Sequence, residues 1–490
     1  MDAATALVAR PAAEVSAEFE VLVDHHLLHV QGPENVRMHD IVRGFARARA
    51  FEEDSRDELR QVLSRLVRHY LRWADQADHL LYPHRHRRGL SDALGSTRTP
   101  PDHDRKRWNG WLWAGPADAS TWFQREWRNC LMLADHAIEH EMKENGALLV
   151  HALSQFLETQ GRREDAGRAQ ETAVRAARET LSPATLAQAL FELSFTRFRI
   201  GHHAAALEHA TEALSIFRSS GDRRAEAKTL DRIGIVLWTT ARYREALAHH
   251  QEAQDLHRKA GDPHGEADSL GYAAIALWHL GRYGDALQHL NFSLDMCRRS
   301  GDRRREAMVL NNLGNVQRQR GFHRDAVRYY EESSAIFKQI GGVQNEAILK
   351  NNIGGVHHYK VDYPSALRCY REAITVFREI GDRRNTADAL NSIGAVYLLM
   401  GRPSEALVHH QQAEGAARDV GDPYQQLQAL RGMADAHQAC GRYPLALDHY
   451  HKALDISVPY QQAKAHEGIA ATVLHLQGEQ AARIHWRQAL

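Results

Sequence analysis

Residues 301–340 read GDRRREAMVLNNLGNVQRQRGFHRDAVRYYEESSAIFKQI, and this forty-residue phrase recurs with variations from about residue 221 to residue 440. Gly301 opens the phrase and Gly321 divides it into two halves, each of the length of one helix. Both positions are marked again in the other periods. Those equivalent to Gly301 are Gly221, Gly261, Gly341, Gly381 and Gly421, and those equivalent to Gly321 are Gly201, Ala241, Gly281, Val361, Gly401 and Gly441. Two breaks per period predict two helices per repeat.

A helical hairpin of this size cannot bury its apolar face alone, so each hairpin is expected to stack on the next. The repeat pattern therefore predicts an all-α solenoid over residues 118–490, with about nine helical pairs. The first helices are expected to begin near residues 143, 182, 222, 262, 302, 342, 382, 422 and 460. Gly478 comes three residues earlier than the period requires, which predicts a trimmed final repeat.

Small residues recur where two helices of a repeat must approach closely. They stand at positions 234, 274, 314, 354, 394 and 434 of the first helices, and as Ala246, Ala286, Ala326, Ala366, Ala406 and Ala446 in the second helices. This pattern resembles tetratricopeptide (TPR) repeats. That family usually has a period of 34 residues, whereas the period here is forty, as in the lengthened repeats of kinesin light chains and spindle-orientation adaptors.

The composition of the 490 residues restricts the class of partner. Lys plus Arg and Asp plus Glu number 62 each, so no global field favours nucleic acid or an anionic membrane. No stretch reaches the roughly 18 apolar residues of a membrane span. The cysteines lack the spacing of a metal site, which favours a reducing compartment; they are Cys130, Cys297, Cys369 and Cys440. A soluble, cytoplasmic protein is expected.

Residues 1–52 do not follow the repeat. A helical pattern from about Ala12 to His26 precedes two short apolar runs, 27–30 and 36–38, and a second helix follows Asp40, which is expected to cap it. Helix, hairpin and helix is a winged-helix order. The phrase LVDHHLLHVQGPENVRMHDIVRGFARARA resembles the end of the NB-ARC module of STAND signalling ATPases, especially actinobacterial transcriptional regulators that carry TPR repeats. The resemblance covers roughly residues 15–135.

In that family the Met-His-Asp motif senses bound ADP, so the resemblance implies that His39 is a nucleotide-sensing residue. The chain departs from the family in one respect: no GxxxxGK[ST] loop occurs to cradle phosphates. No cofactor is therefore expected, and ADP or ATP would bind only if a separate nucleotide-binding module packed on the winged helix. A purely structural role for His39 at the helix start is the alternative. DNA reading by Arg43, Arg47 and Arg49 is disfavoured, because apolar residues share that helix.

Two further segments precede the solenoid. Residues 53–82 predict a long amphipathic helix that braces the winged helix. Residues 83–117 predict a loop or linker, in which basic residues alternate with tryptophans. These residues are Arg85, Arg87, Arg88, Arg105, Lys106, Arg107, Trp108, Trp111 and Trp113. They could bind single-stranded nucleic acid, although a solvated loop is the simpler interpretation.

The first helices are expected to line the concave face, where a peptide or protein ligand would bind. The apolar candidates are Phe195, Phe198, Trp238 and Trp278, and the polar candidates are Asn311, Asn312, Asn315, Arg318, Asn351, Asn352, His358 and Asn391. Asparagine side chains both donate and accept, which suits the main chain of an extended peptide. The Asn-Leu-Gly-Asn phrase at 312–315 is similar to one that spindle-orientation adaptors use for this purpose.

Five histidines recur at one phase of the period and indicate packing rather than chemistry: His209, His249, His289, His409 and His449. His136, His140 and Glu141 share one helix face, but no HExxH motif occurs and no metal site is expected. Neither a GxSxG nor a dinucleotide-binding GxGxxG motif is present, so no catalytic residue is assigned. The sequence leaves two functions open. One is a peptide-binding sensor and scaffold segment of a STAND-like regulator, which relays binding through the winged helix. The other is a free-standing TPR adaptor without an ATPase.

Overall fold

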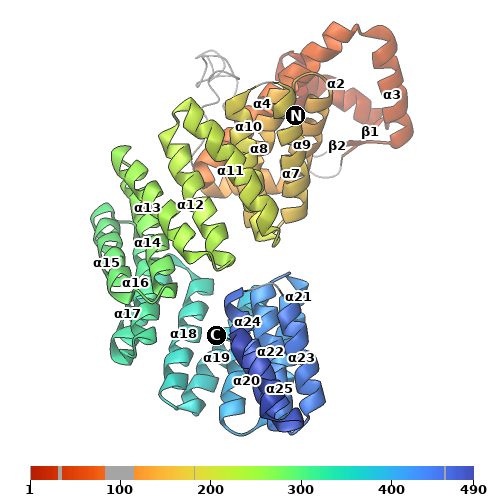
Figure 1. The fold of residues 1–490 in the computed structure, drawn as a ribbon. Helices are drawn as coiled ribbons and strands as arrows, with labels where there is room; N and C mark the ends of the chain where they lie inside the picture. Colours follow the sequence, from red (N-terminus) through yellow and green to blue (C-terminus); the bar gives the residue numbers. More distant parts are fainter. Residues whose placement is uncertain (1, 31–35, 83–114, 181, 457–458, 490) are drawn as a thin grey trace. The chain divides into compact units, whose positions relative to one another are not determined.

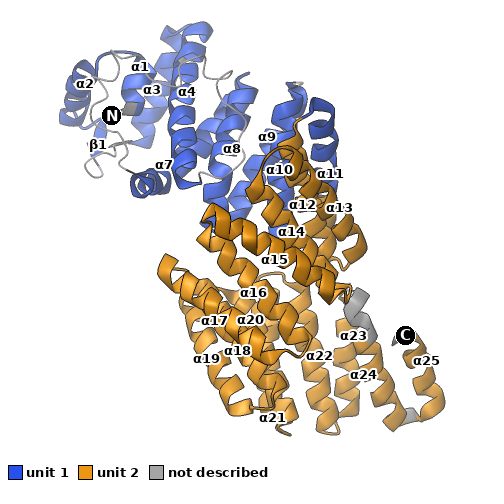
Figure 2. Ribbon diagram, turned by 90° about the vertical axis from the view of Figure 1, so that its left-hand side faces the viewer, with its two compact units in different colours: residues 1–199, 208–221 blue, residues 200–207, 222–490 orange. Residues whose placement is uncertain are grey.

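A computed structural model describes residues 2–30, 36–82, 115–180, 182–456 and 459–489 (Figure 1). Almost all of these residues are helical. They fall into two compact units, one of residues 1–199 and 208–221 and the other of residues 200–207 and 222–490 (Figure 2). The predicted linker with its arginines and tryptophans, Arg85 to Trp113, lies outside the described residues.

Unit 1 begins with two helices, a hairpin and two further helices. The bounds are α1 Asp2–Val8, α2 Ala12–Asp24, β1 Leu28–Val30, β2 Val36–Met38, α3 Asp40–Glu53 and α4 Arg56–Leu81. β1 and β2 pair antiparallel, with Leu28 opposite Met38. The order of helix, hairpin and helix is as expected from the sequence, while its assignment as a winged helix stays a prediction.

The cap of α3 differs from expectation. His39, not Asp40, is the N-cap residue, and its Nδ1 accepts from the Ile41 N–H at 3.4 Å. Asp40 instead occupies the first helical position, where its carboxylate accepts from Arg43 at 2.8 Å. The reason is that the extended backbone required at a cap falls on His39, with φ −60° and ψ 144°.

α4 begins where a capping box fixes it, since the Ser55 hydroxyl accepts from the Glu58 N–H and the Glu58 carboxylate accepts from the Ser55 N–H. The helix packs against α1, α7 and α8. It buries Val67 and Leu71 on its apolar stripe. It therefore contacts α1, within residues 1–52, as well as the first helices of the array, and its role as a brace for a winged helix stays a prediction.

The array confirms the predicted all-α, TPR-like solenoid. α7 spans Pro116–Glu139, and each first helix after it begins within one residue of the predicted position. In unit 1 the helices are α8 Lys143–Thr159, α9 Arg163–Glu179, α10 Pro183–Arg199 and α11 His203–Ser220. The first five residues of α11, 203–207, belong to unit 2. In unit 2 they are α12 Arg223–Thr239, α13 Tyr243–Lys259, α14 Pro263–His279, α15 Tyr283–Ser300, α16 Arg303–Gln319, α17 His323–Ile340, α18 Val343–Tyr359, α19 Tyr363–Glu379, α20 Arg383–Leu399, α21 Pro403–Asp419, α22 Pro423–Ala439, α23 Tyr443–Asp455, α24 Pro459–Gln477 and α25 Glu479–Ala489.

The Gly-Asp pairs terminate one helix and start the next. Gly301 has φ 71°, the left-handed conformation that closes α15, and the Asp302 carboxylate then accepts from the Arg305 N–H at 3.0 Å to cap α16. At the other break of the repeat, Val361 takes φ 63° without being glycine. The turn geometry is thus imposed on Val361 by its neighbours.

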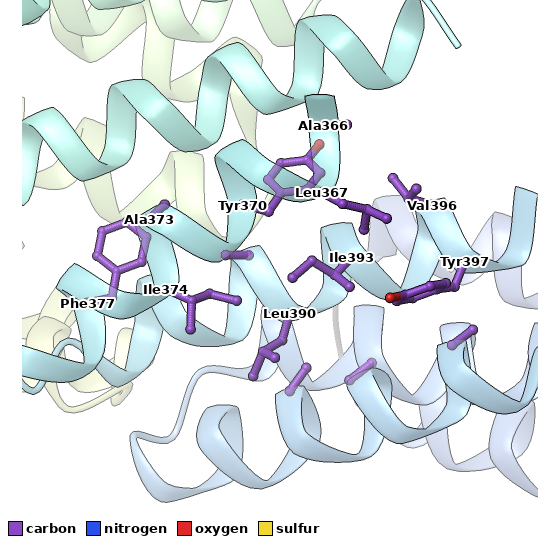
Figure 3. Packing of buried hydrophobic residues seen from close by; sticks show 14 of the residues in the cluster. Ala366, Leu367, Tyr370, Ala373, Ile374, Phe377, Leu390, Ile393, Val396 and Tyr397 are labelled. Atoms are coloured by element: carbon purple, nitrogen blue, oxygen red, sulfur yellow. The ribbon is translucent and has the colours of Figure 1, made fainter. Parts of the chain in front are cut away.

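The hydrophobic core runs along the stacked helices. Figure 3 shows Tyr370, Ile374 and Phe377 of α19 close to Leu390 and Ile393 of α20 in one such cluster. Each hairpin contributes to a cluster that the next hairpin completes. No single repeat would bury these side chains alone.

Candidate functional site

The first helices of unit 2 carry equivalent positions forty residues apart. Trp238, Trp278, Arg318 and His358 occupy one such column at the ends of α12, α14, α16 and α18, and all four are half-buried. The column changes from aromatic to basic along the chain. This change divides the candidate surface into an aromatic cluster and a polar face.

The aromatic cluster consists of Trp238, Tyr243, Trp278 and His279. The His279 ring stacks on Tyr243 with centroids 4.7 Å apart and on Trp278 at 5.0 Å, and it meets Trp238 edge-on at 5.5 Å. Burial lowers the pKa of His279. Trp238 Nε1 is buried and has no hydrogen-bond partner among the described residues. The cluster offers a partly exposed apolar and aromatic platform.

The polar face is formed by Asn311, Asn315, Arg318, Asn352 and His358. Asn352 Nδ2 donates to Asn311 Oδ1 at 2.8 Å, which joins α18 to α16. The Tyr330 hydroxyl donates to Asn315 Oδ1 at 2.8 Å. The amide oxygens of Asn311 and Asn315 therefore both accept a hydrogen bond. Within the described part of the chain, neither Nδ2 donates to a protein atom. Asn311 and Asn315 are one helical turn apart, so their NH₂ groups lie on the same side of α16.

Arg318 lies three residues beyond Asn315 on the same side of α16. Its guanidinium lies 5.7 Å from the Tyr359 ring centroid and reaches α18 at Gly355, where an added Cβ would be 3.4 Å from Nη1. Burial, and secondly the Arg318 charge, lower the pKa of His358. A guanidinium held on an aromatic ring, with neutral amide donors beside it, favours an acidic or carbonyl oxygen as its ligand.

Two of the predicted site asparagines have a structural role instead. Asn391 is 9% exposed, and its Nδ2 donates to the Gln425 main-chain oxygen at 3.1 Å while its Oδ1 accepts from His410 Nδ1 at 3.1 Å. Asn351 is also 9% exposed and donates to Asp388 at 2.9 Å. The expectation that Asn351 and Asn391 face a ligand is therefore wrong, because their amides connect successive repeats.

Asp388 was missed by sequence reasoning. Besides Asn351 Nδ2, it accepts from Gln425 Nε2 at 3.0 Å. Burial raises the pKa of this carboxyl, although these two bonds oppose the shift. The only sequence signal was its place one helical turn before Asn391, which suggests a neighbour but not a hydrogen bond to the preceding repeat.

A second polar cluster lies inside unit 2. Asp231 contacts His250 Nδ1 at 2.7 Å and accepts from the Ser269 hydroxyl at 2.6 Å, and His257 Nδ1 contacts Asp262 at 3.1 Å. Burial raises the pKa of Asp231, but hydrogen bonds from His250 and the other partners outweigh it, and the pKa is lowered. Asp231, His250, His257 and Ser269 are all buried. The cluster therefore connects α12, α13 and α14 and is not open to a ligand.

The remaining predicted residues are spread over both units. Asn312 is half-buried on α16. Phe195 and Phe198, also half-buried, lie on α10 in unit 1, where the Arg199 guanidinium is 6.0 Å from the Phe195 ring. Their participation in one surface with unit 2 stays a prediction. His39 is exposed in unit 1, far along the chain from the repeats.

Two of the three arginines considered for DNA reading, Arg43 and Arg49, have partners on their own helix. Arg43 pairs with Asp40 at 2.8 Å, and Arg49 pairs with Glu52 at 3.5 Å and with Glu53. These pairs reduce the positive field of α3. Among the described helices, none is long and apolar enough to cross a membrane.

Comparisons with known proteins agree with this architecture. The tetratricopeptide-repeat family profile matches residues 186–259, 225–299, 265–339 and 345–419. A search of the curated proteins found no match. Among solved structures, the chain is similar to a Signal Transduction ATPase with Numerous Domains (STAND) protein with a tetratricopeptide repeat sensor from Pyrococcus horikoshii, at 16% identity and a TM-score of 0.55. That match covers 99% of this chain and 62% of the STAND protein, so the chain spans about three fifths of its length.

A second similar structure is a Rap protein complexed with Competence and Sporulation Factor, at 15% identity and a TM-score of 0.51. The match covers 72% of this chain and 100% of the Rap protein. At these identities the likeness concerns the fold. Residues 186–339 and 345–419 are thus tetratricopeptide repeats, within a chain that folds as a TPR-like α-solenoid.

Proposed function

We propose that unit 2 binds an extended peptide or protein segment across its first helices, and that the chain is a sensor and scaffold segment of a STAND-like bacterial signalling or transcriptional regulator. The observation that carries the binding proposal is the set of amide donors on α16. The oxygens of Asn311 and Asn315 are occupied by Asn352 and Tyr330, so their NH₂ groups are the parts left for a ligand. Peptide carbonyl oxygens are suitable acceptors.

The ligand of this surface has two chemical requirements. The Arg318 guanidinium, backed by Tyr359, favours an acidic side chain or a carboxylate. The aromatic cluster at Trp238 and Trp278 favours an apolar or aromatic anchor in the same ligand. A segment with an acidic group and an aromatic residue fits both.

Selection from a random-peptide display library on the full chain tests this proposal. We expect the selected peptides to combine acidic and aromatic residues. The triple variant Asn311→Ala/Asn315→Ala/Arg318→Ala should bind them roughly a hundredfold or more weakly, since each neutral hydrogen bond contributes about 0.5–1.5 kcal/mol and a charged one about 1.5–3 kcal/mol. Arg324→Ala is the control, because Arg324 is exposed at the start of α17, a helix that contributes no residue to the polar face. Unchanged affinity in a triple variant with an intact circular dichroism spectrum would exclude the polar face.

The signalling part of the proposal concerns unit 1. α3 presents Ile41 and Phe45 with exposed fractions of 78% and 68%, next to the exposed His39. An apolar face of this kind suits contact with a protein module rather than DNA. The module would be a nucleotide-binding one, supplied separately, whose bound ADP His39 would sense. The STAND protein with a repeat sensor supports this idea through its fold and its greater length.

The alternative is a free-standing TPR adaptor or peptide sensor. It is favoured by the Rap protein complex, which this chain matches over the whole Rap chain. Adding a candidate nucleotide-binding module encoded beside this chain distinguishes the two functions. Complex formation that is lost in an Ile41→Asp/Phe45→Asp variant supports the regulator, whereas peptide binding with no such complex supports the adaptor.

A further inference from the structure

The last turn of α7, in unit 1, brings together three side chains that commonly bind metal ions. His136, Glu139 and His140 each offer one ligand atom, and these atoms lie within 4.8 Å of one another. The two imidazole rings have centroids 4.2 Å apart. Neither the aromatic cluster nor the polar face of unit 2 involves these residues.

The position of the three side chains follows from the packing of α7. The opposite face of the helix buries Cys130, Ala134 and Ala137, all with an exposed fraction of 0%. Residues separated by three and four positions share a helix face, so His136, Glu139 and His140 must point to solvent together. The backbone of the cluster is therefore fixed, while its side chains are free to rotate and an ion has access from solvent.

Glu139, and not the Glu141 considered from the sequence, is the carboxylate of this cluster. Glu141 lies beyond the helix with φ 64°, and its carboxylate pairs with Arg60 at 3.0 Å. The left-handed turn that ends α7 directs Glu141 away from the helix face, toward α4. The sequence-based expectation of no metal site considered the wrong glutamate.

We propose that His136, Glu139 and His140 bind one divalent transition-metal ion of the zinc type, with water completing a tetrahedral shell. Two imidazole nitrogens and one carboxylate oxygen form a usual ligand set for Zn²⁺, at distances of about 2.0–2.2 Å. Ligand atoms must approach to roughly 3.4 Å for that geometry, which small rotations of exposed side chains achieve. Mg²⁺ and Ca²⁺ are disfavoured because they prefer oxygen ligands.

The ion would have a binding role and not a hydrolytic one. The spacing His-x-x-Glu-His also occurs in a class of zinc hydrolases, in which the glutamate serves chemistry in a cleft. Here all three side chains are exposed, so in the described part of the chain no residue covers them to exclude water or position a substrate. Glu139 is therefore assigned as a third ligand.

Titration of the full, metal-free chain with ZnCl₂ tests the proposal, with Co²⁺ absorption as a report of tetrahedral coordination. The chain has 32 histidines, and others among them can also bind Zn²⁺. The test therefore compares the number of bound ions and their affinity between the wild type and its variants. We expect the wild type to bind one ion more than the variant His136→Ala/His140→Ala, and Glu139→Gln to weaken this ion at least about tenfold. The control His202→Ala/His451→Ala removes two exposed histidines from unit 2 and should retain the ion.

Three results would overturn the proposal. The first is equal stoichiometry and affinity in the wild type and the His136→Ala/His140→Ala variant. The second is an equal loss in the control variant, which would mean that scattered surface histidines bind the metal. The third is a Co²⁺ spectrum of octahedral form. The altered residues are exposed, so circular dichroism should be unchanged; if it changes, the single variant His136→Gln replaces the double variant and should weaken the ion at least about tenfold.

Discussion

The imidazole of His410 on α21 lies directly against Gly394 on α20, where an added Cβ would come within 2.5 Å of Nε2. On its other side the ring meets Gly432 of α22, where an added Cβ would lie 2.3 Å from Cε1. The same packing recurs one and two repeats earlier, where the Tyr370 ring lies against Gly354 and the Tyr330 ring against Gly314. The small residues of the first helices thus make room for large rings of the second helices.

Gly394→Ala is expected to destabilise the protein because its Cβ overlaps the His410 ring. The cost should be about 1–3 kcal/mol, the usual range for overpacking a core. Gly271→Ala on α14 is the matched control, since no atom lies within 4 Å of its added Cβ. There the greater helix propensity of alanine should be neutral or stabilise by up to about 1 kcal/mol. Urea unfolding measures both; equal effects would contradict the packing role of the glycine.

Val361→Gly is expected to stabilise the turn between α18 and α19. Val361 has φ 63°, a conformation that costs a non-glycine residue about 1–2 kcal/mol, whereas Gly401 takes φ 69° at the equivalent position of the next repeat. After allowance for the larger unfolded-state entropy of glycine, the net gain should be about 0.5–1 kcal/mol. The reciprocal change, Gly401→Val, should destabilise. A lower thermal midpoint for Val361→Gly would refute this explanation.

Stability should fall between pH 6.5 and pH 4 because His410 is buried in its neutral form. Burial, together with His409 and Arg431, lowers the pKa of His410 to about 4. In the unfolded chain the imidazole titrates near its ordinary pKa of about 6.5, so between these values only the unfolded state binds the proton. The contribution of His410 is complete above about pH 6.5 and decreases as the pH falls toward 4, by up to about 3 kcal/mol.

Thermal unfolding of the wild type and His410→Gln across this pH range measures the effect. The variant should be less stable at pH 7.5 but should lose less stability on acidification, because one buried imidazole is gone. His410 Nε2 is buried with no partner among the described residues, so a proton added there would have no acceptor. Parallel pH profiles for the two proteins would show that the acid sensitivity comes from other groups.

The isolated chain is expected to turn over no ATP and to bind ADP feebly at best. The sequence has no phosphate-binding loop, and the exposed His39 alone cannot replace a cradle of backbone N–H groups and a lysine. Calorimetry with MgATP and MgADP should detect no tight binding. Tight, Mg²⁺-dependent ATP binding would contradict the proposal that any nucleotide is held by a separate module.

The sequence by itself determined the repeat architecture, since each part of that prediction depends on local chemistry. Glycine at the left-handed breaks, aspartate at the caps and small residues at the close approaches act within one hairpin. They placed every first helix of the array to within one residue. The absence of a phosphate-binding loop is likewise a property of the sequence alone.

Only the tertiary structure decided which polar side chains remain for a ligand. Asn311, Asn351 and Asn391 stand at one phase of the period. Their hydrogen bonding nevertheless differs, because their partners come from other repeats, 34 to 41 residues away. Both polar atoms of the Asn391 amide are bonded, to Gln425 and His410. In Asn311 only the amide oxygen is bonded, and its NH₂ group remains for a ligand. The choice of Glu139 over Glu141 was settled in the same way, by a turn and by an ion pair to Arg60 on α4. A periodic sequence specifies which face a residue occupies, but the neighbouring helix decides what that residue bonds.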